Sequence, residues 1–252
     1  PDLRVYLTSV TEEWAVATLS GPNASKILKA AGIDISLDPN DFPFMSMQTA
    51  HIAGLPVRIF RISFTGELSY EINIRARHGL ALWTLLMEAG AEHGITPYGT
   101  EAMHVLRAEK GFIIVGQETD GSVTPQDLGM DWIVSKTKPD FIGKRALARA
   151  SMAAENRKQL VGLATRERTR VIPEGAHAVL DPNQPMPMEM LGQVTSSYYS
   201  PNVSASIAMA MLKGGRSLIG GTVYLPMLDG EIIEAEVVEP IFFDPNGERI
   251  NG

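Results

Sequence analysis

The 252 residues suit one large domain or two ordinary domains, and 44% hydrophobic residues with near-zero mean hydropathy are typical of a globular chain with a sizeable core. The net charge of −7, with Lys and Arg scattered along the chain, argues against a nucleic-acid partner. The absence of cysteine excludes disulfides, thiolate metal sites, iron–sulfur clusters and thiol nucleophiles, and no apolar run approaches the roughly 20 residues that span a bilayer.

The histidines are too far apart to form a compact metal site. No two of the five stand two to four residues apart, which is the spacing that places two ligands on one metal ion. We therefore expect no metal centre. The sequence also begins without an initiator methionine, so we expect a fragment or a processed product.

The first elements alternate between strands and a helix. Residues 14–19 (WAVATL) are typical of a buried strand, and a turn leads from them into a helix over residues 24–31 that ends at Gly32. Residues 47–53 and 57–63 flank Gly-Leu-Pro and predict a β-hairpin.

A carboxylate among apolar neighbours gives the clearest functional signal. Gly66 provides a turn before residues 70–74 (YEINI), whose alternation points Glu71 and Asn73 away from the face formed by Tyr70, Ile72 and Ile74. A carboxylate on a rigid strand can accept two parallel hydrogen bonds from an N–H/NH2 edge such as that of a 2-amino-4-oxopteridine. The alternative is a solvated glutamate on an exposed strand face.

Helical patterning continues in the middle of the chain. Residues 79–90 have helical apolar spacing, and Thr100 begins a second helix that should turn Ala102, Val105 and Leu106 inward and end at Gly111. Residues 112–115 (FIIV) predict a strand. Apolar residues 131–134 follow a turn-rich stretch, and residues 140–145 predict the start of another helix.

The pattern changes near Ala150. After the polar residues 151–158, short apolar runs alternate with Gly, Pro and Asn turns, which is typical of a small β-barrel or sandwich. We place a boundary at about Ala154, giving regions 1–154 and 155–252. The glycine-rich residues 214–221 lack the Gly-Lys-Ser/Thr ending of a phosphate loop and are better interpreted as barrel turns.

Six motifs in order resemble the aminomethyltransferase (glycine-cleavage T-protein) family. They are LSGPNA at residues 19–24, FTGE with YEI at 64–72, LRAEKG at 106–111, TP at 124–125 with Trp132, FIGK at 141–144 and GQVTS at 192–196. The resemblance implies an α+β aminomethyltransferase-like folate-binding fold, partial because its N-terminal segment is missing, followed by a small C-terminal β-barrel.

Within this family, residues 104–121 and 196–201 are most similar to the C-terminal part of the α subunits of heterotetrameric sarcosine oxidases. The resemblance implies that tetrahydrofolate in this region captures the one-carbon unit from sarcosine as 5,10-methylenetetrahydrofolate, with glycine and hydrogen peroxide as the other products. It also implies FAD, FMN and NAD elsewhere in the complex, and β, γ and δ subunits and the N-terminal part of the α subunit as partners in the cytoplasm. No dinucleotide fingerprint follows a strand here, so we expect no sarcosine oxidation or peroxide from this chain alone.

The resemblance assigns three folate-binding residues by position. Glu71 matches the glutamate that binds the pterin edge, Trp132 matches an aromatic residue near the folate channel, and Arg216 lies near an arginine of the barrel after a one-residue gap. The family's second pterin-side arginine falls on Met103, and its catalytic aspartate belongs upstream of the matched sequence, which leaves the catalytic residue unassigned.

Two other functions fit the same motifs. One is an aminomethyltransferase of the glycine cleavage system or a fragment of a dimethylglycine oxidase. The other, of a different class, is a non-catalytic folate-sensing or assembly module. Upstream sequence with a nucleotide-binding fingerprint, or copurification with flavin-bearing subunits, would separate these alternatives from the sarcosine oxidase function.

Overall fold

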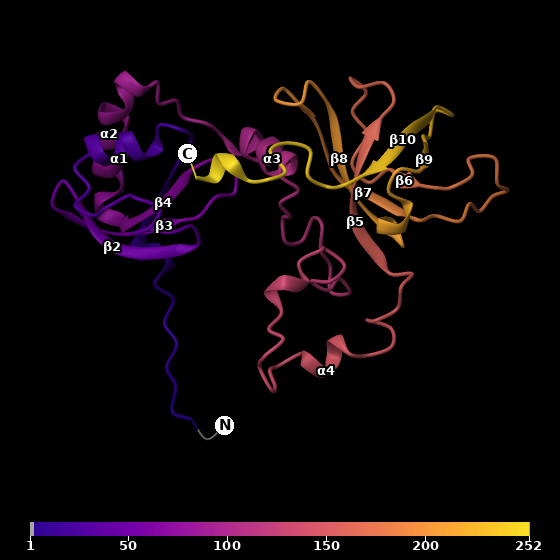
Figure 1. The fold of residues 1–252 in the computed structure, drawn as a ribbon, viewed down its shortest axis with the longest axis horizontal. Coiled ribbons are helices and arrows are strands. Elements are labelled where there is room, and N and C mark those ends of the chain that lie inside the picture. Colours follow the sequence, from indigo (N-terminus) through magenta and orange to yellow (C-terminus); the bar gives the residue numbers. More distant parts are fainter. Residues whose placement is uncertain (1–2, 252) are drawn as a thin grey trace. The chain divides into compact units, whose positions relative to one another are not determined.

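The computed structural model describes residues 3–251, which form two compact units. The first unit contains residues up to Met103 together with the segment from Asn246, and the second contains His104–Pro245 (Figure 1). No helix among residues 3–251 combines the length and apolar character needed to cross a bilayer.

The first unit is a four-stranded antiparallel sheet with helices on one face. The strand order is β1-β4-β3-β2. Figure 1 shows α1 and α2 on the same side of this sheet. The elements in chain order are η1 (Thr11–Glu13), β1 (Trp14–Ser20), α1 (Ala24–Ala30), β2 (Ser46–Ile52), β3 (Leu55–Arg61), β4 (Ser69–Arg75), η2 (Ala76–His78), α2 (Gly79–Gly90) and η3 (Ala91–His93).

The core of the first unit lies between the sheet and these helices. Leu82 and Leu86 of α2 and Leu28 of α1 pack with the inward residues of β4, namely Tyr70, Ile72 and Ile74. The alternation predicted for β4 is confirmed, because these three residues are fully buried while Glu71 and Asn73 are half-buried on the opposite, open face.

The hairpin between β2 and β3 is tighter than the sequence predicts. Ala53 and Gly54 form the turn with φ of 49° and 79°, and Ile52 pairs with Leu55. Leu55 and Pro56 therefore belong to β3 rather than to the turn. Pro56 is tolerated because it lies at the beginning of the strand, where a missing N–H interrupts the ladder least.

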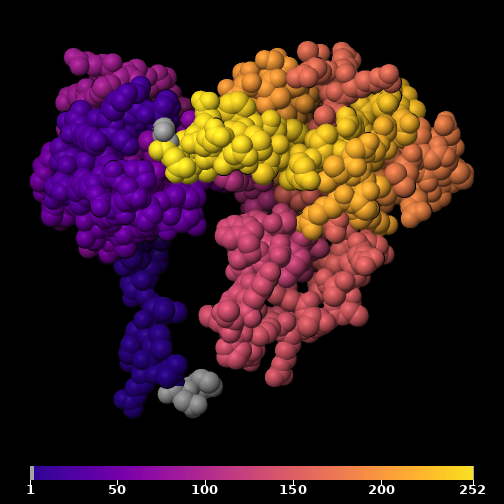
Figure 2. Space-filling model, viewed as in Figure 1, coloured from indigo at the N-terminus to yellow at the C-terminus, as the bar shows by residue number. Residues whose placement is uncertain are grey.

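Residues 3–10 precede η1 as an extended segment with exposed apolar side chains. Tyr6 and Leu7 are 93% and 94% exposed. Figure 2 shows this indigo segment as a thin column that protrudes from the rest of the first unit. At the other end of the sequence, η6 (Glu248–Ile250) also belongs to the first unit, where Arg249 Nε donates to Glu67 Oε1 at 2.7 Å.

The second unit is built on a six-stranded antiparallel sheet that closes into a barrel. The order is β6-β7-β8-β5-β10-β9, and a bridge between Val179 and Tyr224 joins its two ends. The elements are η4 (Asp131–Ile133), α4 (Lys144–Leu147), β5 (Lys158–Thr165), β6 (His177–Ala178), β7 (Gly192–Ser200), β8 (Ala205–Lys213), η5 (Gly215–Leu218), β9 (Thr222–Pro226) and β10 (Ile232–Val238).

The last turn of α3 (Thr100–Glu109) is held against the barrel by charged groups. Arg107, Ala108 and Glu109 are its buried residues, whereas Ala102, predicted to face inward, is exposed. Ala108 packs with apolar residues of β5 and β8. Glu109 accepts hydrogen bonds from Ser200 and Asn202 at 2.5 and 2.8 Å. The end of the helix is thus fixed both by the apolar contacts of Ala108 and by the hydrogen bonds of the Glu109 side chain.

The strand predicted over residues 112–115 is wrong. Phe112 N donates to Arg107 O at 2.9 Å, which closes the end of α3. Ile114 N donates to Glu118 Oε2 at 2.7 Å. Both backbone donors are therefore used locally, and the apolar run does not join a strand ladder. Residues 131–133, for which the sequence analysis names no element, form η4.

The polar stretch at residues 151–158 leads to a prediction about proteolysis. Glu155 and Asn156 are exposed and belong to no helix or strand. We expect brief digestion with a glutamate-specific protease to cut first after Glu155, because proteases need a locally unfolded, exposed backbone. Mass spectrometry of the fragments checks the site. Full protection of residues 151–158, with earlier cleavage elsewhere, would contradict the predicted boundary near Ala154.

Candidate functional site

Glu71 lies near the middle of the open face of the first unit's sheet. Its strand, β4, is flanked by β1 and β3, so that Thr18 lies directly opposite on one side and Phe60 on the other. Glu71 Oε1 accepts a hydrogen bond from Asn73 Nδ2 at 3.1 Å. Among the residues that the structure describes, Asn73 is the single hydrogen-bond partner of this carboxylate. Glu71 therefore keeps free acceptor positions next to a half-buried aromatic ring.

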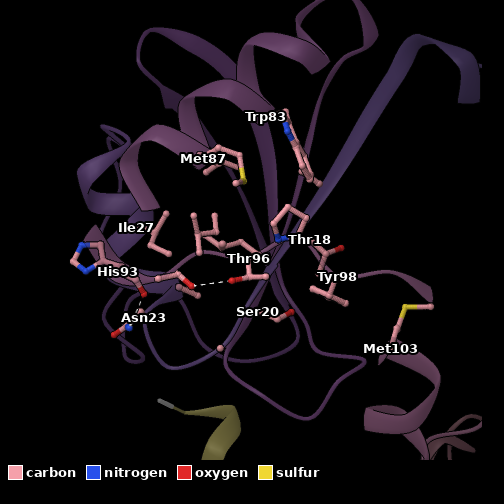
Figure 3. Close-up of a pocket in the computed structure, with 18 of the residues that line it drawn as sticks. Thr18, Ser20, Asn23, Ile27, Trp83, Met87, His93, Thr96, Tyr98 and Met103 are labelled. Carbon is pink, nitrogen blue, oxygen red and sulfur yellow. Dashed lines mark hydrogen bonds between the residues drawn. The ribbon is translucent and has the colours of Figure 1, made fainter. Parts of the chain in front are cut away.

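A cavity of about 570 Å³ lies beside β1, at the edge of the same sheet (Figure 3). β1, the start of α1, α2 and residues 93–100 line it, together with Met103. Thr18, the residue opposite Glu71, is also a lining residue. None of the lining residues is Arg, Lys, Asp or Glu. The position where the resemblance expects a second arginine thus presents the Met103 thioether to an uncharged cavity.

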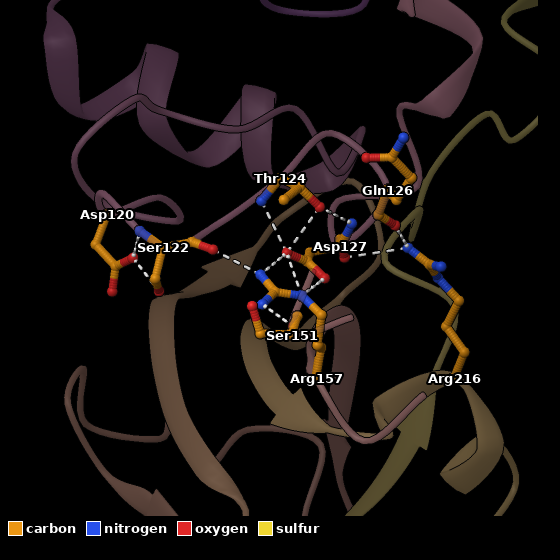
Figure 4. Close-up of polar contacts among 8 residues, drawn as sticks. All are labelled: Asp120, Ser122, Thr124, Gln126, Asp127, Ser151, Arg157 and Arg216. Atoms are coloured by element: carbon orange, nitrogen blue, oxygen red, sulfur yellow. Dashed lines mark hydrogen bonds and ion pairs between the residues drawn. The ribbon is translucent and has the colours of Figure 1, made fainter. Parts of the chain in front are cut away.

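Trp132 and Arg216 belong to the second unit and are described within it. Trp132 lies in η4 and is 71% exposed. Arg216, in η5, is occupied by backbone carbonyls: its Nη2 donates to Gln126 O at 2.5 Å and to Asp127 O at 3.1 Å (Figure 4). Arg216 therefore fastens the turn at residues 126–127 to η5. A folate-binding role for either residue stays a prediction.

The same turn contains an ion pair that the sequence does not single out. Asp127 accepts hydrogen bonds from Arg157 Nε at 2.9 Å and from Thr124 N at 2.7 Å (Figure 4). Burial alone would raise the pKa of the Asp127 carboxyl, but the hydrogen bonds from Arg157 and Thr124 outweigh burial and lower that pKa below its ordinary value of 3.8. This network joins the segment after α3 to Arg157, the residue just before β5.

This depressed pKa predicts the pH range in which the pair stabilises the second unit. Because the folded-state pKa of Asp127 lies below its unfolded-state value, its stabilisation is complete above the unfolded value and disappears as the pH falls through the folded value. We expect Asp127→Asn to lower the urea midpoint at pH 7 and to have a progressively smaller effect as the pH falls below 3.8. Asp229→Asn, at an exposed aspartate of the same unit, is the control. An Asp127→Asn effect independent of pH would contradict the assignment.

Sequence comparisons match both parts of the chain to one family. The model of the GCVT N-terminal domain matches residues 1–138, and that of the glycine cleavage T-protein C-terminal barrel domain matches residues 158–244. The chain is 31% identical over 236 residues to an aminomethyltransferase of Halothermothrix orenii. That alignment covers 94% of this chain and 63% of the relative. The crystal structure of glycine cleavage system aminomethyltransferase T from Bartonella henselae superposes with a TM-score of 0.76 at 25% identity, over 92% of this chain and 60% of that one.

Higher identity is found with much longer proteins. The chain is 47% identical over 259 residues to sarcosine oxidase subunit alpha of Corynebacterium sp. (strain P-1) and 39% identical over 261 residues to that of Rhizobium meliloti (strain 1021). Each alignment covers the whole chain but only 26% of the relative. The resemblance predicted from the motifs and the α+β fold with a C-terminal barrel are thereby confirmed. With both domain models matched in order along it, the chain belongs to the glycine cleavage T-protein family.

Proposed function

We propose that this chain is the tetrahydrofolate-binding region of a sarcosine oxidase α subunit, where the one-carbon unit from sarcosine is captured as 5,10-methylenetetrahydrofolate. The observation that carries the proposal is Glu71, a carboxylate with free acceptor positions on the open face of a rigid sheet. Similarity to sarcosine oxidase alpha subunits over the whole chain supports this type of enzyme over a free aminomethyltransferase. Glycine and hydrogen peroxide are the other products of the proposed reaction.

The residues around Glu71 fit the pterin part of tetrahydrofolate. The carboxylate can accept two parallel hydrogen bonds from the N–H and NH2 groups of the pterin edge. Phe60 provides an apolar flank, and the hydrogen bond from Asn73 restricts the carboxylate to one orientation. Bound tetrahydrofolate supplies the nucleophilic nitrogens that accept the one-carbon unit, and Glu71 fixes their orientation.

The redox step belongs to other parts of the proposed enzyme. Oxidation of sarcosine requires a cofactor that side chains do not replace, and we propose FAD, FMN and NAD outside this chain, with β, γ and δ subunits and the rest of the α subunit as partners. This chain alone is expected to bind folate without forming peroxide. An assay with sarcosine, oxygen and tetrahydrofolate checks this expectation against a heat-treated control.

The proposal is tested by Glu71→Gln. We expect this variant to weaken tetrahydrofolate binding by one to two orders of magnitude, because an amide offers one acceptor and a misplaced donor where two acceptors are needed, a loss of about 1.5–3 kcal/mol. Isothermal titration calorimetry measures the affinity. Glu88→Gln, at an exposed glutamate of α2, is the matched control. Unaltered affinity of Glu71→Gln for tetrahydrofolate would refute the proposal.

A further inference from the structure

Arg61, the last residue of β3, is a buried cation without a counter-charge. Residues 3–251 contain three buried basic side chains, and two of them, Arg107 and Lys110, lie 3.1 and 3.0 Å from a carboxylate. Arg61 is 1% exposed, its Nη1 donates to Phe42 O at 2.8 Å, and its Nε has no hydrogen-bond partner. No carboxylate among the described residues pairs with it. Because a buried charge without a partner is strongly unfavourable, this position favours an anion.

Arg61 lines a cavity of about 330 Å³ in the first unit. Tyr70 of β4 and Ser25 and Lys29 of α1 line it as well. Arg61 and Tyr70 belong to the buried set of their strands, so this cavity lies on the face of the sheet that α1 covers and not on the open face of Glu71. The volume is at the low end of the range of roughly 300–1,000 Å³ that is usual for small-molecule sites, which suits a small ligand.

The other polar groups of this cavity also favour a negative charge. Lys29 is exposed and forms no ion pair with the residues that the structure describes. Ser25 Oγ and Tyr70 Oη lie 2.9 Å apart, and because one of two bonded hydroxyls donates to the other, one O–H remains available to a ligand. Asp38 is the one carboxylate among the lining residues, but its Oδ1 accepts hydrogen bonds from Asn40 N and Nδ2, both at 2.9 Å. The cavity therefore combines two cations and a free hydroxyl donor with a single carboxylate that is bonded within its own turn.

We propose that this cavity binds a small oxyanion, either an inorganic ion of the phosphate type or the carboxylate of a small organic acid. A guanidinium group presents parallel N–H donors that match two oxygens of either group, and Lys29 adds a second positive charge. The bound anion neutralises Arg61 and connects α1 to the end of β3. The site is separate from the proposed folate site, because Glu71 lies on the opposite face of the sheet.

The test follows the Arg61 Nε–H resonance by NMR while the full 252-residue chain is titrated at constant ionic strength. Inorganic phosphate is one titrant and acetate is the other, so that the stronger binder identifies the source of the oxyanion. We expect a saturable shift of this resonance. Lys29→Gln should raise the dissociation constant roughly three- to fivefold, because an exposed charge contributes modestly. Lys26→Gln, at an exposed lysine of α1 outside the cavity, is the matched control and should leave the dissociation constant unchanged.

Asp38→Asn separates the proposal from a direct pairing of Asp38 with Arg61. If the cavity binds an anion, removing this negative charge should tighten binding of the same titrant, and the asparagine keeps an acceptor for Asn40 N. A lowered thermal midpoint for Asp38→Asn without tighter binding would make Asp38 the partner of Arg61 and would overturn the proposal. Absence of a saturable shift with both titrants, or equal effects of Lys29→Gln and Lys26→Gln, would overturn it as well.

Discussion

Glu118→Gln should destabilise the second unit by about 3–5 kcal/mol, because it leaves Arg107 as an uncompensated buried charge. Both side chains are 0% exposed, and Arg107 Nη1 lies 3.1 Å from Glu118 Oε2. The Ser196 hydroxyl accepts from Arg107 Nη2 at 2.5 Å and donates to Glu118 Oε1, and Ile114 N donates to Glu118 Oε2 at 2.7 Å. An amide at position 118 replaces one of these acceptors by a donor. Urea denaturation followed by circular dichroism measures the loss.

The double variant Arg107→Met/Glu118→Leu tests whether the loss comes from the unpaired charge. Removing both charges avoids the buried unpaired ion, and apolar replacements of buried pairs are often neutral or stabilising. We therefore expect the double variant to be more stable than Glu118→Gln alone, although Ser196 and Ile114 N lose a partner in it. Exposed Glu231→Gln, whose partner Arg170 is also partly exposed, should have a small effect. A loss below about 1 kcal/mol for Glu118→Gln would contradict the role assigned to the pair.

The position of Glu71 could be predicted because strand periodicity is strict. Side chains alternate between the two faces of β4, and the residues on either side of Glu71 are apolar and face the core. Glu71 therefore lies on the open face. The neighbours of Glu71 could not be predicted in this way. Phe60 and Thr18 are brought beside it by strand pairing between distant segments, and only the register of the sheet identifies them.

Buried polar residues make β7 difficult to predict from apolar patterning. β7 contains Thr195, Ser196 and Ser197, which resemble a loop when hydrophobicity is the signal, yet all three are buried. Thr195 Oγ1 donates to Met209 O at 3.1 Å, and Ser196 is bonded to the Arg107–Glu118 pair. Residues 112–115 show the opposite case, an apolar run that predicts a strand but forms none. Two of its backbone N–H groups bond to the end of α3 and to Glu118 instead of to a neighbouring strand.

The buried ion pair between Arg107 and Glu118 could not be predicted from the sequence for a related reason. Arg107 and Glu118 each look like solvated surface residues in the sequence, because Arg and Glu are rarely fully buried unless they are paired. Their pairing depends on the tight return of the chain after Gly111, which has a φ of 67° and lies so close to Pro240 O that an added Cβ would be 2.5 Å away. The motif at residues 106–111 thus combines a buried arginine, Arg107, with the glycine at which the chain turns back.

Gly192→Ala should destabilise the barrel by about 3 kcal/mol, because β7 has no room for a methyl group there. Gly192 pairs with Ala178 on one side and with Leu212 on the other. A Cβ at this position would lie 1.9 Å from Met211 O and 2.9 Å from Met211 C. These are backbone atoms of β8, so the clash cannot be relieved by a side-chain rotation, and β7 must move away from β8. Such movement also displaces Ser196, four residues along β7, from the buried Arg107–Glu118 pair.

Gly121→Ala is the matched control for this prediction. It changes the same residue type in the same unit, has no atom within 4 Å of the added Cβ, and is not among the glycines with positive φ. Thermal unfolding followed by circular dichroism should show a lowered midpoint for Gly192→Ala and a midpoint close to that of the unsubstituted chain for Gly121→Ala. Equal midpoints for the two variants would mean that β7 and β8 are not packed at Gly192 as closely as the ladder requires, and the register between Gly192 and Leu212 would then be wrong.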